Sequence, residues 1–197
     1  AMVQTYIIRS DVSPLDASKS GLDHAICGAC PMRGTPTKDP ARRQAIGRDC
    51  YVNLGQGPTV VFKAFKRGAY AHASGSDIAE LGRGRMVRIG TYGDGAAVPT
   101  DVWRELTSEA IGWTGYSHNG GDPAIYMQSV ETLAQAESNW SKGNRTFRTV
   151  ADVSEVKKGK EIFCPASKQA GARVQCNACK LCAGNAIMAK SIAIVMH

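Results

Sequence analysis

The residues best suited to chemistry are cysteines, and four of the seven lie close together in the sequence. Cys176, Cys179 and Cys182 are each separated by two residues, and Cys164 precedes them, followed directly by proline. A C-x-x-C-x-x-C run places three thiolates on one tight turn, and a remote Cys-Pro can complete the ligand set of a [4Fe–4S] cluster. Zinc, the competing metal, more often takes cysteines in separated C-x-x-C pairs. The spacing therefore predicts a metal centre here and favours iron–sulfur over zinc.

A second group of potential ligands lies near the start of the chain. It consists of His24, Cys27, Cys30, again followed by proline, and Cys50. One interpretation is a second cluster on the three cysteines, with His24 or an outside ligand on the fourth iron. Another is a structural zinc bound by His24 and the three cysteines. The third is an ordinary core thiol at Cys50 beside an isolated Cys27–Cys30 pair.

Length and composition indicate a single domain of ordinary globular type. The chain has 197 residues, 43% of them hydrophobic and 21% charged, which is enough to bury a substantial core. We predict one β/α domain over residues 1–197, with metal-binding segments at 24–50 and 164–182. There is no signal-peptide pattern and no apolar run of the roughly 20 residues that a membrane span requires. Seven cysteines in such a chain predict a cytoplasmic protein whose thiols are ligands and not disulfides.

The net charge of +7 permits contact with nucleic acid or another polyanion. The basic residues are dispersed, as at Arg42-Arg43, Lys66-Arg67 and Lys157-Lys158, and no zinc-finger or RNA-recognition signature accompanies them. A basic solvated surface is the favoured interpretation of this charge.

Strand and helix patterns alternate along the chain. Runs rich in β-branched and aromatic residues predict strands. Proline or Asp/Thr starts and glycine stops predict helices between them. The expected strands cover 3–9, 86–90, 113–118, 124–130, 146–150, 160–163 and 191–196, and the main expected helices cover 58–67, 100–111 and 133–141. This alternation predicts an α/β fold with mostly parallel strands, either a partial or degenerate β/α barrel or an open doubly wound sheet.

Several polar residues fall at or just beyond the carboxyl ends of the expected strands, the edge that forms the active face in parallel β/α folds. We expect Asp94 and His118 to orient a substrate or move a proton, and Tyr116 and Asp152 to contact a cofactor. Simpler roles are also open, because Asp94 suits a turn, His118 a structural histidine and Asp152 a cap. The full set at these positions is Asp94, Tyr116, His118, Ser129, Asp152, Cys164 and His197.

A set of longer motifs resembles a family of functionally uncharacterised, cysteine-rich proteins carried by phages and plasmids. The motifs are H-A-I-C-G-A-C-P, G-R-D-C-Y-V-N, Y-G-D-G-A-A-V-P, W-T-G-Y-S-H and F-C-P-A-S…C-N-A-C-K-L-C. The resemblance covers nearly the whole chain. It implies a cysteine-bound centre, and the host cytosol as location if the gene is phage-encoded, but no activity.

A second resemblance is to radical SAM enzymes, which are partial β/α barrels. In that family three cluster cysteines follow the first strand. A glycine-rich motif after the second strand holds the amino group of the methionine part of S-adenosylmethionine. Cys27, Cys30 and Cys50 follow the first expected strand here, and Gly93-Asp94 follows the next clear one, although the compact C-x3-C-x2-C run is absent. The resemblance implies S-adenosylmethionine as a cofactor, with Gly93 in its site.

Two functional hypotheses follow. The first is an iron–sulfur protein whose second centre has an open iron for a small-molecule substrate, a sulfur species or S-adenosylmethionine. This hypothesis leaves open whether the protein is an enzyme, such as an iron–sulfur oxidoreductase or a radical SAM-like enzyme. Its chemistry is then one-electron transfer, with an external electron donor, or Lewis-acid activation. The alternative is a zinc-stabilised nucleic-acid-binding protein of phage or plasmid origin, and a purely structural metal protein is a third possibility.

Overall fold

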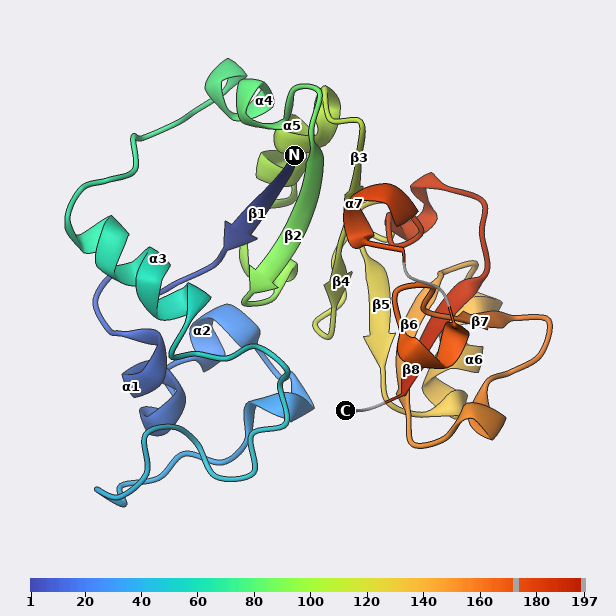
Figure 1. The fold of residues 1–197 in the computed structure, drawn as a ribbon, viewed down its shortest axis with the longest axis horizontal. Coiled ribbons are helices and arrows are strands. Elements are labelled where there is room, and N and C mark those ends of the chain that lie inside the picture. Colours follow the sequence, from blue (N-terminus) through green and yellow to red (C-terminus); the bar gives the residue numbers. More distant parts are fainter. Residues whose placement is uncertain (172–173, 196–197) are drawn as a thin grey trace.

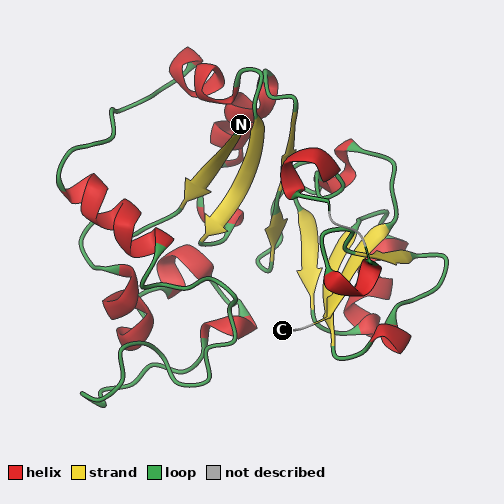
Figure 2. Ribbon diagram, viewed as in Figure 1, coloured by secondary structure: helices red, strands yellow, loops and turns green. Residues whose placement is uncertain are grey.

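The strands pair only in parallel and form two sheets (Figure 1, Figure 2). The computed structural model describes residues 1–171 and 174–195, so Met196 and His197 lie outside the described residues. Strand order is β1-β2-β3 in one sheet and β4-β5-β6-β8-β7 in the other. The strands are β1 (Met2–Tyr6), β2 (Met86–Tyr92), β3 (Gly112–Thr114), β4 (Tyr116–Ser117), β5 (Met127–Val130), β6 (Thr146–Val150), β7 (Glu161–Phe163) and β8 (Ser191–Val195).

The helices connect these strands or lie in the loops. The predicted α/β fold with parallel strands is confirmed. The α-helices are α1 (Pro14–Ser20), α2 (His24–Cys27), α3 (Gly57–Lys66), α4 (Ser76–Gly82), α5 (Thr100–Ser108), α6 (Leu133–Ser141) and α7 (Cys176–Cys179). Five short 3-10 turns complete the described elements: η1 (Pro31–Arg33), η2 (Gly95–Ala97), η3 (Val153–Glu155), η4 (Lys168–Ala170) and η5 (Gly184–Ala186). None of these helices is long and apolar enough to cross a bilayer.

The predicted strand at 113–118 is interrupted at Gly115, where the two sheets meet. The Gly115 N–H donates to the carbonyl of Cys182, 2.9 Å away, instead of extending a strand ladder. The predicted strand at 124–130 begins only at Met127, because Asp122 accepts bonds from the next backbone N–H groups and closes a turn. Both differences arise from hydrogen bonds that strand propensity does not report.

One face of the sheets, here called the outer face, carries the hydrophobic core. Val87 and Ile89 of β2 pack there in one buried cluster with Trp103 and Leu106 of α5. On the second sheet, Trp140 of α6 donates to the hydroxyls of Thr146 and Ser191. Figure 1 shows α6 behind β5 and β6. Because strand residues alternate between faces and paired residues share one, α5 and α6 cover the same side of the sheets.

On the first sheet the opposite face, here called the inner face, is more polar, whereas on the second sheet the buried polar side chains of Thr146, Arg148, Glu161 and Ser191 lie on the outer face. Arg88 of β2 pairs with Gln4 and Thr114 on the neighbouring strands, so the three side chains share this face. The Tyr116 ring continues it and stacks on Phe147 of β6, with ring centroids 4.3 Å apart. The C-terminal cysteine run, including α7, lies in front of the strands in Figure 1. The inner face is therefore the side on which the chemistry-capable residues gather.

A buried ion pair joins the second sheet on its outer side. Arg148 of β6 donates from Nε and Nη2 to the two carboxylate oxygens of Glu161 at 2.9 and 2.7 Å, and their side chains are 3% and 0% exposed. The Lys157 N–H donates to the same carboxylate. Because β7 pairs only with β8, this contact is a direct link between β7 and β6 across the intervening strand.

Replacing Glu161 by Gln should lower the free energy of unfolding by about 3–5 kcal/mol, because it leaves the Arg148 charge buried without a counter-charge. Urea unfolding followed by circular dichroism measures the loss. Glu80→Gln is the matched control: its partner Arg83 is exposed, so the change should stay below about 1 kcal/mol. Equal effects of the two substitutions would contradict a structural role for the Arg148–Glu161 pair.

Candidate functional site

The C-terminal cysteines come together in space as well as in sequence. Burial, followed by the charges of Cys164, Cys179 and Cys176, raises the pKa of the Cys182 thiol to about 12. Burial likewise raises the pKa of Cys164, and Cys176 and Cys179 raise it further. Interactions between charges fade beyond about 10 Å at moderate salt, so effects of this kind come from neighbouring groups. The remote Cys-Pro cysteine thus lies within electrostatic range of the C-x-x-C-x-x-C run.

Two local features position this group. Cys164 follows β7 directly, and its N–H donates to the Ala193 carbonyl of β8 at 2.8 Å. Cys176 and Cys179 begin and end the single turn of α7, and Lys180 then adopts a left-handed conformation, with φ of 55°. That reversal carries the chain to Cys182, whose carbonyl accepts the Gly115 N–H where the two sheets meet.

A buried arginine without a carboxylate partner lies beside Cys182. Arg145 is 8% exposed, and its guanidinium donates to the carbonyls of Leu181, Gly184 and Lys190 at 2.7–2.8 Å. Among the described residues no acidic group pairs with it. Burial lowers the pKa of Arg145, and the charge of Cys182 opposes that effect. A buried cation held only by neutral carbonyls is costly, so an anionic group at the adjacent cysteines would stabilise it.

The N-terminal cysteines line a pocket of about 90 Å³ at the carboxyl ends of β2 and β4. Burial raises the pKa of Cys27 to about 12, with further contributions from Asp23, Cys30 and Cys50, and that of Cys30 to about 11. The sequence-predicted residues that line this pocket are Cys27, Cys30, Cys50, Gly93, Asp94, Tyr116 and His118. Residues from four separate segments are therefore brought to one cavity.

Asp94 and Asn119 tie the pocket loops together. Asp94 is 7% exposed and accepts bonds from the N–H groups of Ala96 and His118 and from Asn119 Nδ2, at 2.7–2.9 Å. Asn119 also donates to the Cys27 carbonyl and accepts from the Ala29 N–H. With these bonds Asp94 holds the loops in place, and the cysteine loop depends on a residue 90 positions away.

Asn119 is not among the site residues predicted from the sequence. A lone asparagine in an Asn-Gly-Gly turn gives no signal of a long-range contact, since its local role explains it fully. Gly28 offers the complementary evidence in the structure, because a Cβ there would collide with the Asn119 side chain, and its φ is +54°. The glycine after Cys27 therefore makes room for the asparagine that holds the loop.

His118 makes a close imidazole–carboxylate contact at the pocket. Its Nε2 lies 2.9 Å from Glu131 Oε1, with the two side chains 21% and 31% exposed. Ser129, another residue predicted at a strand end, lies beside them in an adjoining surface hollow. An imidazole next to a carboxylate can hold a proton or transfer one to a bound molecule.

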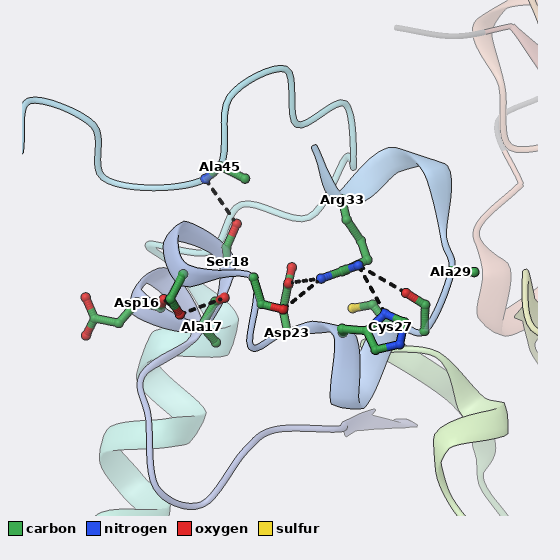
Figure 3. A network of polar contacts seen from close by, with 12 residues as sticks. Asp16, Ala17, Ser18, Asp23, Cys27, Ala29, Arg33 and Ala45 are labelled. Atoms are coloured by element: carbon green, nitrogen blue, oxygen red, sulfur yellow. Dashed lines mark hydrogen bonds and ion pairs between the residues drawn. The ribbon is translucent and has the colours of Figure 1, made fainter. Parts of the chain in front are cut away.

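His24 and Asp152 lie apart from the pocket lining. His24 Nδ1 is 3.3 Å from Arg33 Nη1, and Arg33 forms an ion pair with Asp23. Figure 3 shows the Arg33 guanidinium between Asp23 and the segment that carries Cys27. Asp152 caps the turn η3 by accepting from the Ser154 N–H at 2.8 Å and is exposed. His24 therefore contacts Arg33, and Asp152 caps the η3 turn.

Three side chains lie between the two cysteine groups. Arg88 donates to the Tyr51 hydroxyl at 3.2 Å, and its charge lies 6.0 Å from the centre of the Tyr51 ring. Although Tyr51 is 68% exposed, the surrounding protein raises its pKa by desolvation, and Cys50 and Cys176 raise it further. Burial also raises the pKa of Tyr116, with contributions from Tyr51 and Cys182. Tyr51, which follows Cys50 in the sequence, therefore also lies within electrostatic range of Cys176 from the other group.

All seven cysteines are free thiols. Within residues 1–171 and 174–195, no set of three or more His, Cys, Asp or Glu side chains already surrounds a point where a single metal ion could bind. Comparisons with models of protein families, with curated proteins and with solved structures found no match. The functional argument therefore depends on the site itself.

Replacing Asn119 by Ala should release the loop that carries Cys27 and Cys30. The expected cost is about 1–3 kcal/mol of unfolding free energy, because the carbonyl and N–H that it binds lose their partner. The expected signature is faster alkylation of Cys27 and Cys30 by iodoacetamide, mapped by mass spectrometry. Asn139→Ala serves as control, since the Asn139 side chain donates to the Gln135 carbonyl of its own helix. Unchanged alkylation rates in Asn119→Ala would show that the loop is held by other contacts.

Proposed function

We propose that this chain is an iron–sulfur protein with two cysteine-ligated centres that face each other across the inner side of the sheets. Cys164, Cys176, Cys179 and Cys182 are the ligands of a [4Fe–4S] cluster. Cys27, Cys30 and Cys50 hold a second centre at the strand-end pocket. The observation that carries the proposal is the proximity of Cys164 to the C-terminal run, indicated by the effect of Cys176 and Cys179 on the pKa of Cys164 and by the effect of Cys164 on the pKa of Cys182.

The charge balance around Cys182 supports an anionic centre. Four thiolates around a cluster give it a net negative charge, and Arg145 supplies a buried positive charge that no carboxylate in the described chain neutralises. Bound iron would also reverse the raised pKa values of these thiols, since a metal ion stabilises the thiolate. The protein thus places a cation where a cluster would need one.

At the N-terminal centre three protein thiolates leave one coordination position for an outside ligand. A cluster bound there would supply one-electron or Lewis-acid chemistry to that ligand. The pocket that receives the ligand is lined by Gly93, Asp94, Tyr116 and His118. In this proposal Asp94 holds the loops at the correct spacing, while the His118–Glu131 pair holds or moves a proton. A small-molecule substrate, a sulfur species or S-adenosylmethionine fits this role.

The positions of the crossover helices bear on the finer architecture. α5 and α6 lie on the outer face, whereas α7, in the crossover from β7 to β8, lies on the inner face. Helices on both faces suit an open doubly wound sheet, and parallel strands with cysteine loops beside them suit the partial β/α barrel of the radical SAM resemblance. Seven free thiols suit a reducing compartment such as the cytosol.

A zinc-stabilised nucleic-acid-binding protein is the alternative. Two of the arginines that contribute to the positive charge are paired with acids: Arg83 with Glu80 and Glu109, and Arg42 with Asp39. Those partners reduce the positive charge that these side chains offer to phosphates. The alternative is tested by the same metal analysis as the main proposal.

Protein purified and reconstituted without oxygen should contain iron and acid-labile sulfide, absorb near 400 nm and give a paramagnetic signal when reduced. A change of that signal on addition of S-adenosylmethionine would identify it as the outside ligand. A colourless protein that contains stoichiometric zinc, and whose binding to DNA or RNA falls steeply with salt, would establish the alternative instead.

Cys179→Ser should abolish the C-terminal centre and reduce soluble yield, because ligand binding and folding are coupled. Cys50→Ser should remove the other centre and leave the first. Iron and sulfide quantification of the two variants measures this division. Unchanged iron content in Cys179→Ser would contradict the assignment of that group.

A further inference from the structure

The hydroxyl of Tyr92 is buried without a partner. Tyr92 ends β2, is 3% exposed, and packs in the core cluster with Ile7 and Ile26. Its Oη has no hydrogen-bond partner among the described residues. Buried tyrosine hydroxyls normally have one, and an unmet group inside a folded protein therefore indicates a missing partner.

This hydroxyl belongs to the N-terminal cysteine pocket. Tyr92 lines the cavity together with Cys27, Cys30 and Cys50. Burial raises the pKa of Tyr92, and Cys27, Asp23 and Cys50 contribute to the shift, which places the phenol close to these thiols. Tyr92 thus lies in the same cavity lining as the three cysteines that would hold the centre.

The unmet groups of this pocket identify the missing partner as a hydrogen-bond acceptor. Arg33 Nε, which can only donate, is a second buried group without a partner in the same cavity lining. The carboxylates there are already engaged, Asp23 by Arg33 and Asp94 by three donors. Thiolate and sulfide sulfur atoms are acceptors, and they are the acceptors that a cysteine-bound cluster brings into the cavity.

We propose that the Tyr92 hydroxyl donates a hydrogen bond to a sulfur atom of the centre held by Cys27, Cys30 and Cys50 and raises its reduction potential. This inference rests on the proposed function and assigns Tyr92 a tuning role. Reduction adds negative charge to the sulfur atoms, so a donor stabilises the reduced state more than the oxidised state.

The test uses the full chain, reconstituted without oxygen, in a redox titration followed by electron paramagnetic resonance. Cys50→Ser and Cys179→Ser assign the two couples. Tyr92→Phe should retain the iron content and shift the potential of the N-terminal centre to a more negative value, leaving the other couple unchanged. Tyr92→3-fluorotyrosine keeps the ring and strengthens the donor, so it should shift the same couple in the opposite direction even if the Phe variant folds poorly.

Tyr126→Phe is the matched control. Tyr126 is 1% exposed and its hydroxyl also has no partner in the described chain, but it does not line the cysteine pocket. Both couples should be unchanged in this variant. Potentials that do not respond to either change at Tyr92, in protein that holds two iron–sulfur centres, would overturn the inference and leave the proposed function intact. A wild-type protein without iron would overturn the proposed function itself.

Discussion

The carboxylate of Asp94, together with the amide of Asn119, is the constraint on which the pocket depends. Three loops meet there: the one after β2, the one after β4 and the one that carries Cys27. A parallel sheet brings strand ends to one edge but does not orient the loops that follow. The oxygens of Asp94 and the two ends of the Asn119 amide supply that orientation. Without them the cysteines would be near the strand ends but free to move with their loop.

The two faces of the sheets differ in how their charged side chains are compensated. The outer face buries the apolar cluster under α4 and α5 and the Arg148–Glu161 pair, which is fully compensated. The inner side carries Arg88 and Arg145, which have no carboxylate partner among the described residues. An uncompensated buried charge is costly. An anionic group on the inner side would therefore stabilise these two cations.

Residue spacing was sufficient to predict the grouping of the cysteines and the alternation of strands and helices. The alternation led to the parallel α/β fold, and the N-terminal cysteines and the strand-end positions of Asp94, Tyr116 and His118 account, with Gly93, for half of the pocket lining. The remaining features depend on contacts between distant segments. The local sequence around Asn119, Arg145 and Tyr92 does not mark them as site residues. Asn119 bonds the distant Cys27 carbonyl, and Arg145 bonds the Leu181 carbonyl next to Cys182. The buried Tyr92 hydroxyl has no partner among the described residues.

The order of the strands has a consequence for how the protein is made. β7 emerges from the ribosome before β8, yet β8 is its neighbour in the described sheet, and the whole cysteine run lies between them in the sequence. During synthesis, β7 consequently remains without its partner strand until about 30 further residues have been added. All four C-terminal cysteines are therefore made before the Ala193 carbonyl that fixes Cys164 in the sheet is available.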